Sequence, residues 1–293
     1  MKIIELFKSK KPVIAFEIFP PKPETPLEKI YASLAKFKRM KPDYVSVTYG
    51  ALGGTKVRTI EITSKIKKDY QIESMAHLTC IGHKRESIDE ILRDMHANNL
   101  QNVLALRGDP PSGQSVINTP PGGFEYANQL VEYIKSKNGF CIGAAAYVEG
   151  HSECYRIKDD LVNLKNKVDA GVDFLVTQLF FDNRKFFDFI DRIRRMGIKC
   201  PVAPGIMPVF KADQIKAITA KSGCSIPASL VLMMDKYGSN PDDLRKAGIE
   251  YAAKQIRELM ENGADGIHLY TMNRPISTEN ILKQSGIFGN NAG

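Results

Sequence analysis

Reactive and hydrogen-bonding side chains recur at the ends of apolar segments along this chain. The carboxylic acid Glu17 lies near the end of PVIAFEIF, and the imidazole of His77 lies near the end of IESMAHLT. Arg107 and Asp109 end the segment NVLALRGD, and Gln178 lies in VDFLVTQLF. Acids, bases and amides that converge on one pocket can bind and convert a small polar molecule. The pattern therefore favours an enzyme.

Glu17 is the first candidate for acid–base chemistry, because it interrupts the otherwise apolar strand FEIF. A buried carboxylate is costly unless it is paired, or unless its pKa rises and it becomes neutral. A raised pKa would suit a general acid near neutral pH. The alternative is a carboxylate that only hydrogen-bonds a Thr or Gln of a neighbouring strand.

The tripeptide Arg107-Gly108-Asp109 directly follows an apolar strand. The glycine would let the backbone approach a ligand closely. The two charged side chains could clamp a polar heterocycle, or they could pair with each other. The tripeptide alone leaves both readings open.

A second polar group lies in the segment DDLVNLKNK, which follows His151. Asp160, Asn163 and Lys167 stand at positions i, i+3 and i+7, so they share one face of a helix. This face either contacts an anionic cofactor or is an ordinary solvated surface.

The motifs of several other chemistries are missing. His77 and His151 could suggest a metal, but the first strand has no HxH pair and no HExxH occurs, so no metal is predicted. No lysine ends a strand, which disfavours Schiff-base chemistry. GxSxG, Walker and strand-following GxGxxG motifs are absent, so barrel loops would hold a nucleotide cofactor.

The elements that position these groups alternate between strand and helix. A short helix is predicted within 1–11, to cover the barrel bottom, and three helices within 211–262. Strands are predicted near 13–19, 44–49, 72–79, 103–107, 140–147, 173–180, 202–206 and 266–271. Eight strands alternating with helices predict an α/β fold, a single-domain (β/α)8 TIM barrel over 1–293, with its site at the carboxyl ends of the strands. The loop 108–123 is expected to contact the ligand, and the tail after residue 280 to be frayed and flexible.

Composition narrows the class further. The 293 residues are 43% hydrophobic and 25% charged with a formal charge of +8, which suits a globular protein and can attract anionic ligands. No basic-aromatic tract suggests nucleic acid, and no segment approaches the ~20 apolar residues of a membrane span. The N-terminal segment lacks a signal peptide, and five cysteines without a CxxC pair indicate free thiols in a reducing cytoplasm.

Taken together, the strand-end motifs resemble the methylenetetrahydrofolate reductase family in its short bacterial form. No single motif is decisive, but all follow the family order over nearly the whole chain. They are FEIFPP (16–21), SVTYGA (46–51), AHLTC (76–80), ALRGD (105–109), AAYVEGH (145–151), LKNKVDAG (164–171), TQLFFD (177–182), PGIMPV (204–209) and LYTMNR (269–274).

The resemblance implies an enzyme that binds FAD noncovalently and reduces 5,10-methylenetetrahydrofolate to 5-methyltetrahydrofolate in a ping-pong reaction. NADH or NADPH would donate the hydride, and the product would supply methyl groups for methionine synthesis. A polyglutamylated folate, a homo-oligomer and the absence of a C-terminal regulatory domain are also expected. The rival readings are a flavin-independent pterin-binding methyltransferase on a similar barrel and a non-catalytic folate- or flavin-binding protein.

The resemblance also assigns roles to single residues. Glu17 matches the general acid, and Asp109 matches a carboxylate beside flavin and pterin. Gln178 matches a contact of nicotinamide and folate, and Thr48 a residue near flavin and nicotinamide. Matches to FAD contacts are His77, Arg107, Tyr147, His151, Asp160, Asn163 and Lys167, with weaker matches at Tyr49, Ala51, Gly108, Tyr126, Ala127 and Cys154.

The substrate side carries one departure from the family. Gln214 and Arg274 match folate contacts. Ile218 stands where bacterial members carry a phenylalanine, so the expected stacking surface is missing unless Phe210 replaces it.

Overall fold

A computed structural model describes residues 1–22, 24–49, 56–109 and 119–287. Within them a nine-stranded parallel sheet runs in the order β7-β6-β5-β4-β3-β2-β1-β9-β8. The strands are β1 (Val13–Ile18), β2 (Tyr44–Val47), β3 (Glu73–Thr79), β4 (Asn102–Leu106), β5 (Cys141–Ala146), β6 (Phe174–Thr177), β7 (Val202–Ala203), β8 (Gly205–Ile206) and β9 (Gly266–Tyr270).

The barrel closes through a strand that is interrupted at Pro204. The sequence predicts one strand over 202–206, but β7 pairs with β6 whereas β8 pairs with β9. Pro204 has no N–H to donate to a sheet ladder, yet its carbonyl accepts from the backbone N–H of His268 at 2.9 Å. β7 and β8 thus act as one broken seventh strand, and the predicted (β/α)8 barrel is confirmed.

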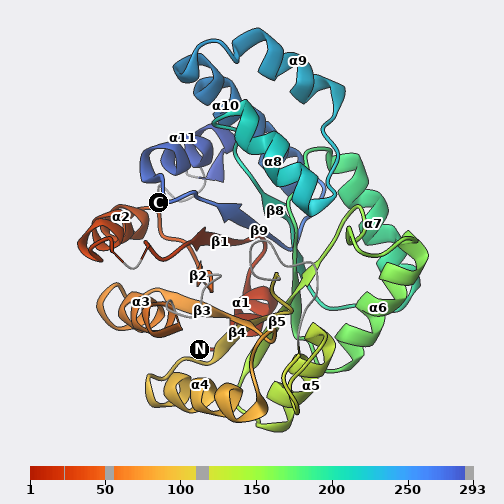
Figure 1. Cartoon of the computed structure of the whole chain (residues 1–293). Helices are drawn as coiled ribbons and strands as arrows, with labels where there is room; N and C mark the ends of the chain where they lie inside the picture. Colours follow the sequence, from red (N-terminus) through yellow and green to blue (C-terminus); the bar gives the residue numbers. More distant parts are fainter. Residues whose placement is uncertain (23, 50–55, 110–118, 288–293) are drawn as a thin grey trace.

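Eleven helices are seen in the described part of the chain, and most surround the strands (Figure 1). They are α1 (Ile3–Ser9), α2 (Glu28–Arg39), α3 (Lys56–Asp69), α4 (Arg85–Ala97), α5 (Ala127–Ser136), α6 (Ile157–Asp169), α7 (Asn183–Arg195), α8 (Ala212–Ser222), α9 (Ala228–Tyr237), α10 (Pro241–Glu261) and α11 (Pro275–Ser285). None of these helices combines the length and hydropathy needed to cross a bilayer.

The inner wall of the barrel changes from apolar to polar along strands such as β1. Successive inward positions are two residues apart, so β1 presents Val13 and Ala15 before Glu17. The lower positions join an apolar cluster that includes Tyr44 and Phe174, and α1 covers it, with the ring of Phe7 5.3 Å from that of Phe174. The predicted N-terminal cover is therefore confirmed, and the polar residues are left at the carboxyl ends.

The C-terminal segment differs from the expected frayed tail. α11 continues to Ser285, five residues past Asn280, and buries Ile281 and Leu282 completely. These two side chains pack in the main hydrophobic core, and this packing stabilises the helix although the segment is rich in polar residues. Helix formation ends at Gly286, which has a left-handed φ of 84°. The prediction was wrong for 281–285, and residues 288–293 lie outside the described chain.

The five cysteines are free thiols, as the sequence indicated.

Candidate active site

A cavity of about 1110 Å³ opens at the carboxyl ends of the strands. Nearly all of the residues singled out in the sequence line it: Glu17, Thr48, Tyr49, His77, Arg107, Gly108, Asp109, Tyr126, Ala127, Tyr147, His151, Cys154, Asp160, Asn163, Lys167 and Gln178. Ala51 lies outside the described residues, as does most of the loop 108–123.

Two predicted folate contacts do not belong to the cavity wall. Gln214 is half-buried on α8, and Arg274 is exposed at the start of α11, with its guanidinium 4.8 Å from the ring centre of Phe210. Phe210 is itself buried and lies outside the lining, whereas Ile218 of α8 is part of it. Phe210 therefore does not replace the missing aromatic surface in this structure.

Glu17 lies between two histidines at the base of the cavity. The Nε2–H of His268 on β9 donates to Glu17 Oε2 at 3.0 Å, and His77 Nε2 on β3 lies 3.5 Å from the same oxygen. His77 Nε2 also hydrogen-bonds Ser46 Oγ at 2.6 Å. Among the described residues the partners of the Glu17 carboxylate are histidines and not the Thr or Gln of the alternative reading, and the Thr271 hydroxyl donates to the backbone carbonyl of Glu17.

The tautomer of His268 follows from its surroundings. Its side chain is fully buried, and its Nδ1 has no hydrogen-bond partner among the described residues. A proton on Nδ1 would be a buried donor without an acceptor, which is costly. A proton on Nε2 supplies the hydrogen bond to Glu17 without that cost.

The acidity of Glu17 differs from the expectation. Burial acts to raise the pKa of Glu17, but the hydrogen bond from His268 and the electrostatic interactions with His77 and His268 bring it below its ordinary value. Burial lowers the pKa of His77 to about 4, against the opposing effect of Glu17. The expected rise in the Glu17 pKa was therefore wrong, because two imidazoles face the carboxylate.

The ion-pair partner of Arg107 is Glu153 and not Asp109. Its guanidinium forms two hydrogen bonds with Glu153 of the β5–α6 loop, at 2.6 and 2.7 Å. Hydrogen bonding to Glu153 raises the pKa of Arg107. The exposed side chain of Asp109 remains at the cavity wall. Gly108 has a φ of 88°, and a Cβ there would lie 2.7 Å from Ile81 Cγ2, so local packing also requires glycine.

The shared face of Asp160, Asn163 and Lys167 on α6 lines the cavity and is not an ordinary solvated surface. Lys167 Nζ donates to the carbonyl of Ala145 at 2.8 Å. Burial lowers the pKa of Lys167 to about 8, opposed by Asp160, while burial raises the pKa of Asp160. A partly desolvated ammonium group thus stands in the wall, where it can meet an anion.

Aromatic groups complete the wall on the same side. The rings of Tyr147 and His151 meet edge to face at 4.5 Å between centres. Burial raises the pKa of Tyr147 to about 12, so its hydroxyl stays protonated. Tyr49 donates or accepts a hydrogen bond with His83 at 3.2 Å.

Sequence reasoning missed His268, Ser46, Glu153 and Tyr270. His268 interrupts the apolar run DGIHLY much as Glu17 interrupts FEIF, and that shared pattern was the available signal. Tyr270 lines the cavity and donates to the Thr177 carbonyl at 3.0 Å. Ser46 and Glu153 are recognisable only through the partners that the fold brings to them.

Comparison with known proteins gives consistent matches over most of the chain. The family model described as Methylenetetrahydrofolate reductase matches residues 2–286. The 5,10-methylenetetrahydrofolate reductase of Escherichia coli (strain K12) is 35% identical over 274 residues, or 94% of this chain and 90% of that protein. Methylenetetrahydrofolate reductase (NADH) 1 of Arabidopsis thaliana is 36% identical over 302 residues, or 98% of this chain and 51% of that protein. The chain thus spans about half the length of the plant relatives.

Among solved structures, an uncharacterized protein from Clostridium thermocellum aligns with a TM-score of 0.66 at 15% identity and 98% coverage of both chains. That protein is described as binding two copies of 5-methyl-5,6,7,8-tetrahydrofolic acid. At this level of identity the likeness concerns the fold alone.

Proposed function

Because the chain belongs to the methylenetetrahydrofolate reductase family, we propose that it reduces 5,10-methylenetetrahydrofolate to 5-methyltetrahydrofolate with NADH or NADPH and noncovalent FAD. The observation that carries the proposal is Glu17, a carboxylate held by His268 and His77 at the base of a large cavity. A cytoplasmic homo-oligomer and a role in methionine synthesis belong to the same proposal and rest on the family alone.

The size of the cavity and the cation Lys167 in its wall support the proposal of bound flavin adenine dinucleotide. The cavity volume of about 1110 Å³ is above the usual range of roughly 300–1,000 Å³ for small-molecule sites, which leaves room for a second molecule. Lys167 uses one of its three donors on Ala145 and keeps two for phosphate oxygens. Arg107 is engaged by Glu153, so Lys167 is the better candidate for the pyrophosphate.

FAD held in part by Lys167 would supply hydride transfer between nicotinamide and folate in the proposed ping-pong reaction. Glu17 would protonate the bridging nitrogen of the folate and open the five-membered ring. Both histidines approach Oε2, so Oε1 is the oxygen left to meet the folate. A bound pterin would exclude water, and desolvation raises a carboxyl pKa, so proton uptake by Glu17 would accompany folate binding.

Gln178 and Asp109 would orient the second molecule. Gln178 Oε1 accepts from the backbone N–H of Leu179 at 2.9 Å, which leaves the Nε2 amide as a donor toward nicotinamide or folate. The Asp109 carboxylate can accept hydrogen bonds from the amino-pyrimidine edge of the pterin, as carboxylates do from nucleobase amino groups. Thr48 lies on the same wall and would contact flavin and nicotinamide.

The test is the absorption spectrum of the purified protein before and after anaerobic addition of NADH or NADPH. We expect a flavin spectrum that bleaches with the reduced nucleotide and returns when methylenetetrahydrofolate is added. A colourless protein that still turns over a methylated pterin would favour the methyltransferase reading. A flavin that stays oxidised and a folate that is never converted would favour a binding protein.

A further inference from the structure

Helix α8 contributes to the cavity wall but has little packing of its own. It buries two side chains, Ile215 and Thr219, and provides Ile218 to the lining. A helix with few buried apolar contacts has low local stability. The position of α8 therefore depends on how its ends are fixed.

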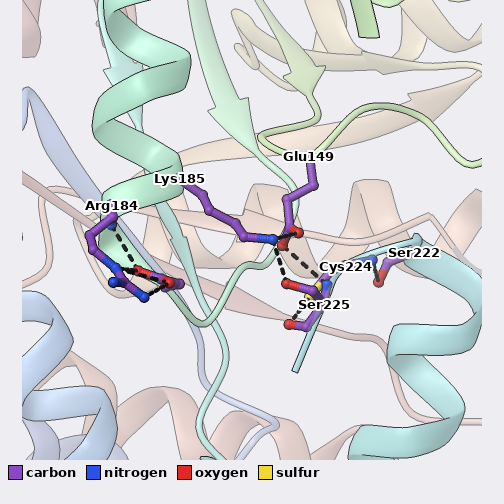
Figure 2. Close-up of polar contacts among 7 residues, drawn as sticks. Glu149, Arg184, Lys185, Ser222, Cys224 and Ser225 are labelled. Carbon is purple, nitrogen blue, oxygen red and sulfur yellow. Dashed lines mark hydrogen bonds and ion pairs between the residues drawn. The ribbon is translucent and has the colours of Figure 1, made fainter. Parts of the chain in front are cut away.

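Three polar residues fix the segment that follows α8, and we call them the clasp: Glu149, Lys185 and Ser225 (Figure 2). Lys185 of α7 forms an ion pair with Glu149 Oε2 and donates to Ser225 Oγ at 2.6 Å. The backbone N–H of Ser225 donates to Glu149 Oε1 at 3.1 Å. The three contacts join the loop after β5, the start of α7 and the α8–α9 connection.

The burial of Glu149 distinguishes the clasp from an ordinary surface ion pair. The Glu149 side chain is 12% exposed and uses both oxygens, one for the cation and one for a backbone N–H. A carboxylate so enclosed is costly when its cation is removed. Lys185 is more exposed, at 41%, so it can be replaced without opening the core.

The clasp is continuous with the cavity wall. α8 ends at Gly223 in the left-handed conformation, and a Cβ built there would lie 3.5 Å from the Cβ of Ser152. Ser152 stands between His151 and Glu153, which both line the cavity. The end of α8 thus packs on the loop that carries residues of the proposed cofactor side.

We infer that Lys185 is a positioning residue, which acts through Glu149 and Ser225 to fix α8 against the β5–α6 loop. Because α8 lines the cavity, the position of this helix in turn sets the affinity for the folate that binds beside the flavin. The inference rests on the proposed function for the identity of that molecule. The position of α8 itself can be measured without it.

The perturbation is Lys185→Met, which keeps an unbranched stem and removes the cation. Ser225→Ala removes one acceptor of the clasp and serves as a second, milder variant. Lys185→Arg keeps the charge and should rescue. The matched control is Arg184→Gln, because Arg184 (labelled in Figure 2) directly precedes Lys185 in α7, is 85% exposed and pairs with Asp182 at the N-cap of that helix.

Two measurements are made on the flavin-loaded full chain, namely hydrogen exchange of residues 212–222 and titration with 5-methyltetrahydrofolate. Lys185→Met should speed exchange in α8 while α10 keeps its protection. It should weaken binding roughly 2- to 30-fold, the usual range for residues that couple two regions, with the limiting rate of folate reduction unchanged. Arg184→Gln and Lys185→Arg should match the wild type in both measurements.

Each outcome bears on the inference. Unchanged exchange in both Lys185→Met and Ser225→Ala would overturn it, as would faster exchange with unchanged folate affinity. If the wild-type protein binds no folate, the proposed function fails, and the exchange experiment alone then decides whether the clasp positions α8.

Discussion

His268→Phe is the sharpest test of how the protein controls Glu17. Phenylalanine keeps the ring that packs edge to face against Tyr270 at 5.4 Å and removes the donor that lies 3.0 Å from Glu17 Oε2. The Glu17 side chain is 17% exposed, so water replaces the lost hydrogen bond poorly. A hydrogen bond to a charged group contributes roughly 1.5–3 kcal/mol, and we expect the free energy of unfolding at pH 7 to fall by that amount.

The dependence on pH follows from the lowered pKa of Glu17. A carboxyl with a folded pKa below its unfolded value of about 4.3 contributes stability above that pH and loses it as the pH falls through the folded value. His268→Phe should raise the pKa of Glu17 in the folded protein, so ionisation of Glu17 should stabilise the variant less than the wild type. The difference in unfolding free energy between the two proteins should be full at neutral pH and should shrink as the pH falls through the folded pKa of Glu17 in the variant and then in the wild type.

The assay is denaturant unfolding of four proteins: wild type, His268→Phe, Glu17→Gln and the double variant. The cycle isolates the pair, because Glu17→Gln keeps the shape and removes the charge. We expect a coupling of roughly 1–3 kcal/mol at pH 7. Costs that add within about 0.5 kcal/mol would refute the idea that His268 stabilises ionised Glu17.

The remaining predictions concern the proposed reaction. Glu17→Gln should leave flavin reduction by NADH intact and slow folate reduction ~10²-fold or more, and stopped-flow rates that match the wild type in both half-reactions would contradict this. Lys167→Ala should lower the flavin-to-protein ratio after gel filtration with an unchanged circular dichroism spectrum, and full flavin occupancy of the variant after dilution would contradict this role of Lys167. Flavin loss from the wild type should increase above about pH 8, where Lys167 loses its proton. Asp109→Asn should raise the flavin potential and weaken folate binding together, as redox and folate titrations would show; no change in either would leave Asp109 without a role at the ligand.

The sequence was sufficient to predict the barrel and most of the cavity wall, because both depend on local patterns. Strand-end side chains such as His77 and Gln178 meet at one edge once the strands are parallel. The partner of Glu17 depends instead on closure of the barrel, which brings His268 beside it from 251 residues away. No local sequence pattern predicts this contact between His268 and Glu17. The direction of the Glu17 pKa change was therefore missed as well.

The same limit explains Arg107 and α11. The tripeptide left open whether Arg107 and Asp109 pair with each other or clamp a ligand, whereas the partner of Arg107, Glu153, comes from the next loop of the barrel. The polar residues around Asn280 suggested fraying, whereas Ile281 and Leu282 find an apolar surface on the folded barrel. Both outcomes depend on tertiary neighbours and not on propensity.

The break at Pro204 shortens the strand pairings on both sides of the seventh strand, β6 with β7 and β8 with β9. Within the described chain, β6 and β7 share two pairs (Leu175–Val202 and Val176–Ala203), and β8 and β9 share two more (Gly205–His268 and Ile206–Leu269). In contrast, β1 and β9 share five pairs. The Thr177 hydroxyl accepts from the Gly205 N–H at 2.8 Å, and the Tyr270 hydroxyl donates to the Thr177 carbonyl. These side-chain hydrogen bonds supplement the few backbone pairs between the strands. Partial opening of the barrel should begin here. Because β9 stays joined to β1 through its five pairs, such opening would leave His268 beside Glu17 and would first part Thr177 from Gly205 and Tyr270, so the polar floor of the cavity would outlast one side of its wall.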